Sequence, residues 1–407
     1  MTSHSHFRRA QAVALLAAAF ATACASSAKQ QSAAANAELN ATKRRASLQI
    51  RAGEYAEAVK SLETVVRQAP KDDQAYTMLG DAYRGLGDFA HAVKSYEQAM
   101  RINYGDYQPH LKLGILLMEH GKTGRALTEF EEAMKFGADD PLVHYNYALA
   151  LHELGRSKEA LEHWRVARDT EPDNPVFVTG VGIGLVGVDD QEAVKQFARA
   201  GEMGLQKDGL YYNNYALALE RVGNNAEAET NFRSAIALAD AKQKEYRRNL
   251  ARHYLRAGKS EDAAREFEQL VQEDGGKWSD TVYAARALVE VARFDDALAR
   301  LSDLADAVAS GKVARSDPRI DRMPPSLGEA LSVVGMAWRG KGDLARSRDY
   351  LRRAAAQAPD DPAVLNNYGV VLAESGMLPD AKAQWRRVLE IDPANATAKA
   401  NLSASGQ

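Results

Sequence analysis

Two stretches of the sequence, YNYALALHELG at 145–155 and NNYALALERVG at 213–223, share the hexamer NYALAL. The two copies start 68 residues apart, which is twice 34. At a spacing of 34, or close to it, a glycine recurs along most of the chain. It is followed five residues later by Ala or Ser, and nine residues later by a bulky apolar residue. The recurring glycines are Gly53, Gly87, Gly121, Gly155, Gly223, Gly258, Gly342 and Gly376.

Each position of this repeating unit has a physical role. Apolar residues spaced three and four apart before the glycine indicate one amphipathic helix, and those after it indicate a second. The glycine permits a tight reversal between the helices, the small residue lets them approach closely, and the bulky residue fills the space beside it. Neither helix can bury its apolar face alone, so successive units must stack. Prolines that end the second helix follow at Pro70, Pro172, Pro359 and Pro393.

The pattern resembles the tetratricopeptide repeat (TPR) over nearly the whole mature chain. Residues 73–106 match that family best, through Tyr76, Leu79, Gly80, Tyr83, Gly87, Ala92, Tyr96 and Ala99. The resemblance implies an all-α fold, a right-handed TPR α-solenoid: a superhelix of about ten helix-turn-helix repeats with a C-terminal capping helix at 396–407. The predicted blocks of repeats are 39–173 (units 1 to 4), 174–208 (a degenerate unit), 209–304 (units 6 to 8) and 328–395 (units 9 and 10).

The degenerate unit at 174–208 is rich in glycine. Gly182, Gly184 and Gly187 spell G-x-G-x-x-G, the dinucleotide-binding fingerprint. That fingerprint needs a strand before it and a helix opening after it, whereas helical units flank it here. With Gly180, these residues therefore predict a loosened helix and a flexible joint, not a cofactor site.

Two further segments depart from the pattern. Residues 305–327 are an insertion, which we expect to lengthen a helix and then loop outward. The unit that starts at 278 has Ala292 where most of the others have the turn glycine, and its second helix matches the pattern less well.

The N-terminus has the features of a secretory signal peptide over residues 1–23. Two arginines precede the apolar run AQAVALLAAAFATA, which is too short for a comfortable membrane span. The run ends in Ala21-Thr22-Ala23-Cys24, which resembles a bacterial lipobox, although Ala21 stands where a large aliphatic residue is usual. The resemblance implies lipidation at Cys24, a flexible tether over 24–38, and an outer membrane location facing the periplasm. The alternative is an ordinary signal peptide and a soluble periplasmic or secreted protein.

The composition argues against several classes of protein. A net charge of −3 lacks the basic excess that a nucleic-acid binder normally carries. Cys24 is the only cysteine, so no intramolecular disulfide and no cysteine metal site can form. The nine histidines include no pair at metal-binding helical spacing, and no Ser–His–acid set accompanies a strained G-x-S-x-G turn. We therefore expect no catalytic residues, no metal and no cofactor.

The resemblance also implies where a partner would bind. In the TPR family the first helices line a concave groove, through positions 2, 5, 6, 9, 12 and 13 of each unit. An asparagine there can hold an extended peptide backbone through its amide, or it can satisfy polar groups of the groove without a ligand. The sequence leaves both open. The asparagines at positions 5 and 6 are Asn146, Asn213, Asn214, Asn249, Asn366 and Asn367.

One part of the predicted groove is strongly basic. The stretch KQKEYRRNLARHYLRAGK (242–259) has seven Lys or Arg and one acid. Its Arg248, Arg252 and Arg256 lie on one helix face at groove positions, and Arg221 and Arg286 occupy groove positions in the adjacent units. We interpret these arginines as a site for an acidic segment of a partner, or for its C-terminal carboxylate. The alternative is that acids on neighbouring helices neutralise them.

Together these features predict a non-catalytic scaffold for protein–protein interaction. By resemblance to TPR lipoproteins, it would be anchored in the membrane by its N-terminal lipid and would support assembly of a cell-envelope machine of the pilus or secretion type. An accessory role in exopolysaccharide synthesis or export, or in recruiting cell-wall hydrolases, is the alternative. An enzyme subunit is a third hypothesis.

Overall fold

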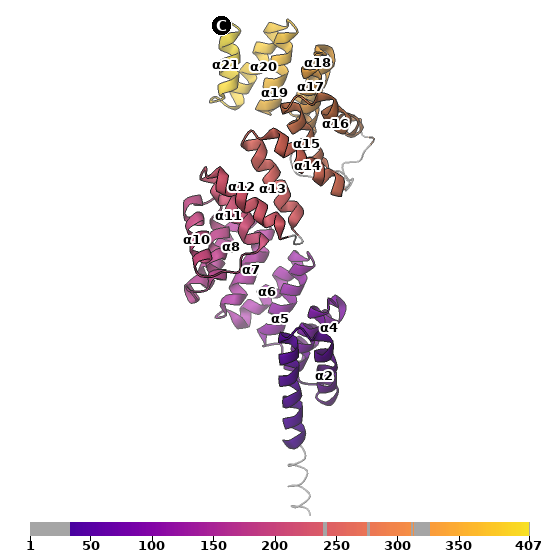
Figure 1. Cartoon of the computed structure of the whole chain (residues 1–407), viewed down its shortest axis with the longest axis vertical. Coiled ribbons are helices and arrows are strands. Elements are labelled where there is room, and N and C mark those ends of the chain that lie inside the picture. Colours follow the sequence, from indigo (N-terminus) through magenta and orange to yellow (C-terminus); the bar gives the residue numbers. More distant parts are fainter. Residues whose placement is uncertain (1–32, 239–241, 275–276, 311, 313–325, 407) are drawn as a thin grey trace, which may run out of the picture. The chain divides into compact units, whose positions relative to one another are not determined.

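The computed structural model describes residues 33–238, 242–274, 277–310, 312 and 326–406. Within these ranges every regular element is a helix and there is no strand, which confirms the predicted all-α fold (Figure 1). The predicted signal peptide, Cys24 and most of the tether lie outside the described residues. None of the described helices contains an apolar stretch long enough to cross a membrane.

The helices follow one another in pairs joined by short turns, and a single helix ends the chain. The first helix covers 33–51 and precedes α2 (Tyr55–Gln68). The others are α3 (Asp73–Gly85), α4 (Phe89–Ile102), α5 (Tyr107–Glu119), α6 (Thr123–Gly137), α7 (Pro141–Glu153), α8 (Ser157–Thr170), α9 (Pro175–Leu185), α10 (Asp190–Glu202), α11 (Gly209–Arg221), α12 (Asn225–Ala237), α13 (Gln243–Arg256), α14 (Ser260–Asp274), α15 (Trp278–Glu290), α16 (Phe294–Ala309), α17 (Leu327–Gly340), α18 (Leu344–Gln357), α19 (Pro362–Glu374), α20 (Leu378–Ile391) and α21 (Ala396–Ala404).

The turns within the pairs contain a residue with positive φ. All eight glycines of the sequence pattern do so, with φ between +66° at Gly121 and +84° at Gly223. Gly187 (φ +81°) provides this conformation in the degenerate unit, and Ala292 (φ +61°) provides it in the unit at 278. A side chain in this left-handed region costs roughly 1–2 kcal/mol, which explains why nearly every unit uses glycine there.

Small residues allow the paired helices to pack closely. A Cβ atom at Gly114 in α5 would lie 2.4 Å from Cε1 of Phe130 in α6, and one at Gly80 in α3 would lie 2.5 Å from Cε1 of Tyr96 in α4. Both rings are fully buried. The aromatic ring of the second helix therefore occupies the space that a side chain on the first would need. The small residues that the sequence predicts at the contact are also fully buried: Ala58, Ala92, Ala126, Ala160, Ala228, Ala263, Ser347 and Ala381.

The chain divides into two compact units, each made of several repeats: the first unit ends at Gly184, and the second unit begins at Leu185. From here on, "first unit" and "second unit" mean these two parts of the chain. The first has two clusters of buried apolar side chains, over 46–82 and 92–150. The second has a large cluster over 216–364 and a smaller one over 365–398. Each cluster is built from successive helix pairs, because each pair buries its apolar face against the next.

The glycine-rich stretch of the degenerate repeat is α-helical from Pro175 to Leu185, as α9. Its glycines have a packing role within the first unit. A Cβ atom at Gly180 would lie 2.6 Å from Cδ1 of Trp164, and one at Gly184 would lie 2.9 Å from both Trp164 and Leu161. The glycines make room for a buried indole. The predicted joint stays a prediction, although the boundary between the two units does fall in this stretch.

Two other segments can be compared with their predicted bounds. Residues 33–38, predicted as the end of the tether, are helical. Helix α16 has 16 residues, more than any other second helix of a pair, as expected from the insertion. Most of the predicted loop, 313–325, lies outside the described residues.

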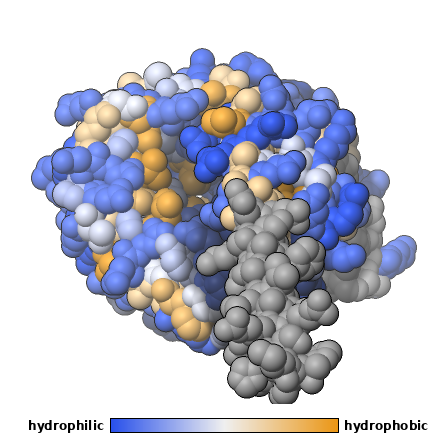
Figure 2. Space-filling view, turned by 90° about the horizontal axis from the view of Figure 1, so that it is seen from below, coloured by the Kyte–Doolittle hydropathy of each residue, from blue (hydrophilic) through white to orange (hydrophobic). Residues whose placement is uncertain are grey.

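The face shown in Figure 2 is largely hydrophilic, with hydrophobic residues scattered over it.

Candidate functional site

The candidate site is a pocket on the first helices of three consecutive pairs in the second unit. Helix α15 contacts α17, and α17 contacts α19, and a pocket of about 340 Å³ lies on them. Its lining residues are Val282, Tyr283, Arg286, Val289, Glu290, Glu329, Ser332, Val333, Met336, Ala363, Val364 and Asn367. Nearly all of them occupy the unit positions that the TPR resemblance assigns to the groove.

The pocket combines an apolar interior with charged edges. Val282 and Val364 are buried, and Val333 and Met336 are half-buried. Arg286 is exposed. Its Nε donates to Oε1 of Glu290, four residues later in the same helix, at 3.4 Å. An ion pair with this exposure contributes little to stability. Arg286 is therefore available to exchange its partner at small cost.

Arg252 in α13 lies beside this pocket and differs from the other arginines of its helix. Its guanidinium carbon lies 5.4 Å from the centre of the Tyr283 ring, which lines the pocket. Its Nε is buried and has no hydrogen-bond partner among the described residues. The Tyr283 ring also stacks on Phe267, with 5.5 Å between the centroids. The arrangement is a cation–π contact with an unused donor.

Arg248 and Arg256 are neutralised by neighbouring helices. Arg248 Nε donates to both carboxylate oxygens of Asp280 at 2.9 Å, and the Asp280 side chain is fully buried. Arg256 Nε donates to Oε1 of Glu220 at 3.0 Å. For these two arginines the structure agrees with the alternative interpretation of the sequence, in which acids on neighbouring helices neutralise the basic face. The predicted face of three arginines therefore leaves Arg252 alone without a carboxylate among the described residues.

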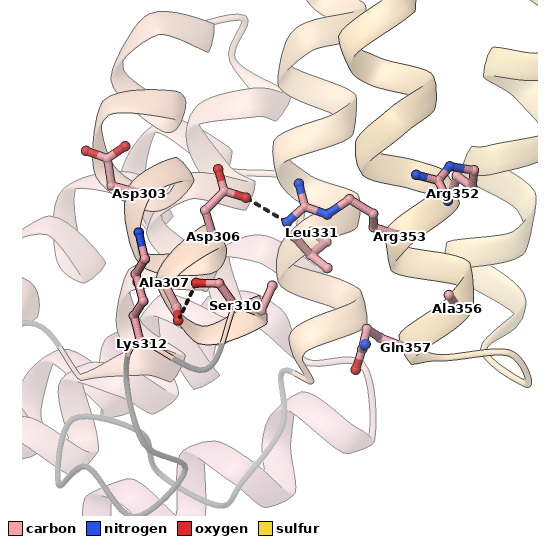
Figure 3. Close-up of a pocket in the computed structure, with 11 residues that line it drawn as sticks. Asp303, Asp306, Ala307, Ser310, Lys312, Leu331, Arg352, Arg353, Ala356 and Gln357 are labelled. Atoms are coloured by element: carbon pink, nitrogen blue, oxygen red, sulfur yellow. Dashed lines mark hydrogen bonds and ion pairs between the residues drawn. The ribbon is translucent and has the colours of Figure 1, made fainter.

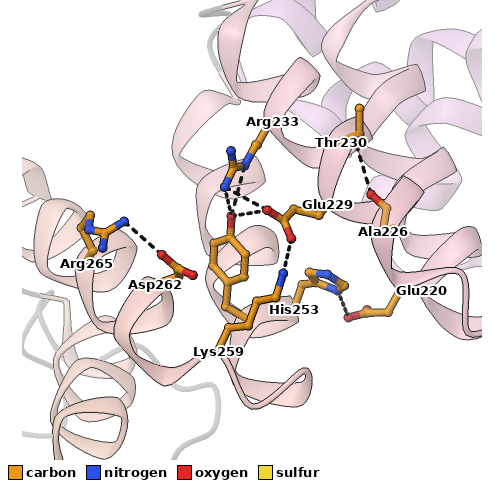
Figure 4. A network of polar contacts seen from close by, with 10 residues as sticks. Glu220, Ala226, Glu229, Thr230, Arg233, His253, Lys259, Asp262 and Arg265 are labelled. Atoms are coloured by element: carbon orange, nitrogen blue, oxygen red, sulfur yellow. Dashed lines mark hydrogen bonds and ion pairs between the residues drawn. The ribbon is translucent and has the colours of Figure 1, made fainter. Parts of the chain in front are cut away.

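Glu220 joins Arg256 to a buried histidine. Its Oε1 lies 2.8 Å from Nδ1 of His253, which is almost completely buried (Figure 4). Burial raises the pKa of Glu220, but the hydrogen bonds from His253 and Arg256 outweigh burial and bring that pKa below its ordinary value. Glu220 is thus held as a carboxylate between α11 and α13. Arg221, the next predicted groove residue, pairs with Asp190 in α10 at 3.0 Å.

A second network in Figure 4 connects α12 with the turn after α13. Lys259 Nζ donates to Glu229 at 2.7 Å, and the hydroxyl of Tyr254 accepts from Arg233 at 2.9 Å. The hydrogen bond from Lys259 lowers the pKa of Glu229. These contacts join consecutive helix pairs, and none of the four residues lines the pocket.

The predicted asparagines fall into two groups. Asn146 and Asn214 donate to backbone oxygens four residues earlier in their own helices, at 2.8 and 2.9 Å. The others connect neighbouring units: Asn249 donates to Asn213 at 2.9 Å, Asn366 to Asn395 at 3.2 Å, and Asn367 to Ser332 at 3.0 Å. Asn367 is the one of the six that lines the pocket.

Sequence reasoning missed the apolar residues of the pocket, Val282, Tyr283, Val333 and Met336. The signal that could have identified them is their place in the repeat, because they occupy groove positions 5, 6 and 9 of their units. Asp280 was missed because position 3 is not one of the groove positions. The residues that the sequence did identify and that the structure brings to the pocket are Arg286 and Asn367, with Arg252 beside them.

Another pocket, of about 670 Å³, lies on α16, α17 and α18 (Figure 3). Two of its arginines are paired: Arg353 with Asp306 at 2.7 Å, and Arg352 with Asp349 at 2.8 Å. It is lined mainly by second helices, whereas the predicted groove positions lie on first helices. Among the described residues, no cluster of three or more His, Cys, Asp or Glu could hold a metal ion. The structure therefore favours the pocket on α15, α17 and α19.

A family model described as Tetratricopeptide repeat matches residues 43–106, 111–175, 191–277 and 335–402. The chain belongs to the tetratricopeptide repeat family. Proteins of this architecture are scaffolds for protein–protein interaction. The helix pairs and glycine turns described above are the repeats of this family.

Several solved TPR structures are similar to parts of the chain. MamA from Desulfovibrio magneticus RS-1 is 20% identical, covering 41% of this chain and 94% of its own, with a TM-score of 0.37. PilW, a type IV pilus biogenesis factor, is 15% identical over 51% of this chain and 97% of its own, with a TM-score of 0.44. The Cut9–Hcn1 complex matches 86% of this chain and 59% of its own at 12% identity and a TM-score of 0.45. No curated protein matches. The assignment to the family rests on the repeat model, since these values are low.

Proposed function

We propose that the protein is a non-catalytic adaptor whose second unit binds an extended segment of a protein partner across α15, α17 and α19. The pocket on these helices carries the proposal, because it combines a half-buried apolar interior with an exposed arginine. An apolar side chain of the partner would fill the space beside Val333 and Met336, and its burial would supply most of the affinity. Arg286 and Arg252 would bind a neighbouring carboxylate of the same segment.

The geometry explains why these two arginines suit a carboxylate ligand. Arg286 has only a weak partner within its own helix, so a ligand carboxylate can replace Glu290 at small cost. Arg252 has its guanidinium carbon 5.4 Å from the centre of the Tyr283 ring and no carboxylate partner among the described residues. A planar guanidinium presents paired donors that match a carboxylate. Arg248 and Arg256 would support the groove rather than contact the ligand.

Selection from a random peptide library on the purified full chain tests this proposal. We expect enriched peptides to combine a bulky apolar side chain with an Asp, Glu or free C-terminus a few residues away. Binding of these peptides should fall at least about tenfold in Arg286→Glu, which reverses an exposed charge, and in Met336→Arg, which fills the pocket. Arg165→Glu is the matched control, because Arg165 is a similarly exposed arginine with an acid on its own helix in the first unit.

Two outcomes would reject the site. Peptides that bind Met336→Arg as tightly as the unmodified chain would place binding elsewhere. An equal loss of binding in Arg286→Glu and Arg165→Glu would indicate a nonspecific charge effect, and no role for this groove.

We also propose that the adaptor works in the cell envelope, anchored by lipid at Cys24 and supporting assembly of an envelope machine. The apolar run before Cys24 and its small-residue end support this proposal. Incorporation of labelled palmitate that disappears in Cys24→Ala would be the expected result. Labelling that persists in this variant, or its absence from the unmodified chain, would favour an ordinary signal peptide.

A further inference from the structure

Three helix-turn-helix repeats, those that start at 107, 141 and 244, carry a basic residue at their fourth position. In each of them this residue contacts the residue at position 23 of the same repeat, on the second helix of the pair. In two units the partner is a carboxylate, and the distances are 2.8 Å for His110–Glu129 and 2.8 Å for Arg247–Glu266. In the unit that starts at 141 the partner is a second histidine: His144 and His163 lie 34 residues after His110 and Glu129. One unit has therefore replaced the acid of this contact by a group that can itself become positively charged.

The geometry of the His144–His163 pair defines its protonation state. His144 is buried, and its Nε2 lies 2.9 Å from the backbone oxygen of Ala138, which can only accept, so Nε2 carries a hydrogen. A neutral His144 must then accept at Nδ1. Nδ1 of His163 lies 2.9 Å from this atom and must donate to it. Two neutral rings satisfy this arrangement, and the hydrogen bond joins α7 to α8.

Acid acts on this arrangement in two steps. A proton on Nε2 of His163 leaves its Nδ1–H in place, but burial and the neighbouring His144 lower the pKa of His163. A second proton on the pair gives both rings an N–H at Nδ1 and places these two groups against each other at 2.9 Å, so the contact must then break. In the unfolded chain both rings take up protons near pH 6.5. The folded pair binds fewer protons below this pH, so its stability is full above about 6.5 and falls as the pH decreases.

The surrounding charges do not remove this effect. On α8, Glu159 and Glu162 act on His163 and favour its charged form, but less than burial and His144 oppose it. The Tyr147 ring of α7 lies edge-on to His163 at 4.8 Å, and Glu131 of α6 acts on Tyr147. Helix α9 has no ionisable side chain. The ionisable groups of α5 bind elsewhere: Tyr107 to Asp140, His110 to Glu129, Lys112 to Asp81 and Glu119 to Arg84.

We propose that the His144–His163 pair is a pH-sensitive contact that loosens the α7–α8 pair in mildly acidic surroundings. Helix α7 contributes Asn146 and Tyr145 to the predicted groove positions of the first unit, so loosening it changes the groove there. The preceding repeat, in which Glu129 lies 2.8 Å from Nδ1 of His110, provides an internal comparison without a second histidine. The effect is independent of the pocket in the second unit.

Hydrogen exchange of the full chain between pH 7.5 and pH 5 tests this proposal, after correction for the intrinsic pH dependence of exchange. Opening of residues 141–170 should increase about tenfold or more from pH 7 to pH 5 relative to residues 107–137. His163→Glu recreates the contact of the preceding unit and should abolish this increase. Glu129→His is the reciprocal variant, and it should make residues 107–137 sensitive to acid even if His163→Glu does not fold.

The proposal is overturned if the unmodified chain opens equally in both segments at pH 5. It is also overturned if His163→Glu folds and keeps the acid sensitivity of 141–170, since another group would then be responsible.

Discussion

Removing Arg248 alone should strongly destabilise the second unit. Asp280 has no exposed side-chain surface, and Arg248, 16% exposed, donates to both of its oxygens. In Arg248→Met the apolar stem of the side chain is kept but the guanidinium is lost. The carboxylate of Asp280 then stays buried without its cation.

The magnitude follows from the position of Asp280. Breaking a buried ion pair by removing one partner typically costs about 3–5 kcal/mol. Asp280 lies in the first turn of α15, where the helix dipole favours a negative charge by roughly 1 kcal/mol. The expected net loss is therefore about 2–4 kcal/mol, which corresponds to a roughly 30- to 700-fold rise in the opening equilibrium of α13 and α15.

Hydrogen exchange at neutral pH, read separately over α13, α15 and the first unit, measures this loss. A local reading is needed because a repeat array does not always unfold as a single two-state unit. Two controls define the cause. Arg286→Met removes an exposed arginine from the adjacent helix and should change opening by less than about threefold. The double variant Arg248→Met/Asp280→Leu removes both charges and should recover most of the loss.

Equal effects of Arg248→Met and Arg286→Met would refute the reasoning, because burial of Asp280 would then carry no penalty. A double variant less stable than Arg248→Met would do the same, since it would show that the apolar site cannot replace the pair.

Two further predictions concern glycine positions. Gly114→Ala should destabilise the first unit by about 1–3 kcal/mol, because its Cβ would overlap Phe130; Gly124→Ala, a helical glycine with no atom within 4 Å, should stabilise it by about 0.5–1 kcal/mol. Urea unfolding of both variants decides this, and the same sign for both would contradict the packing argument. Ala292→Gly should stabilise the second unit by about 1 kcal/mol, since φ is +61° there, and a lower thermal midpoint would show that this turn is not strained.

The sequence by itself determined the repeat, its turns and its groove positions. The turn glycines could be predicted because φ near +75° is a local property of one residue, and the structure gives this conformation to all eight. The pairing of Gly80 with Tyr96 is also local, since both residues belong to one helix pair. The packing role of Gly180 in α9 could not be predicted from that segment alone, because Gly180 packs against Trp164, which lies in the preceding repeat.

Only the tertiary structure decided which groove residues are free to bind. Arg248, Arg252 and Arg256 are equivalent in the helical pattern, but their partners lie one unit away, 32 residues for Asp280 and 36 residues for Glu220. Whether an arginine meets such an acid depends on which side chain the next helix brings within about 3 Å, and the period of the repeat does not specify this. Arg252 meets the ring of Tyr283 instead. For this reason the same spacing yields two structural ion pairs and one arginine that a partner can still use.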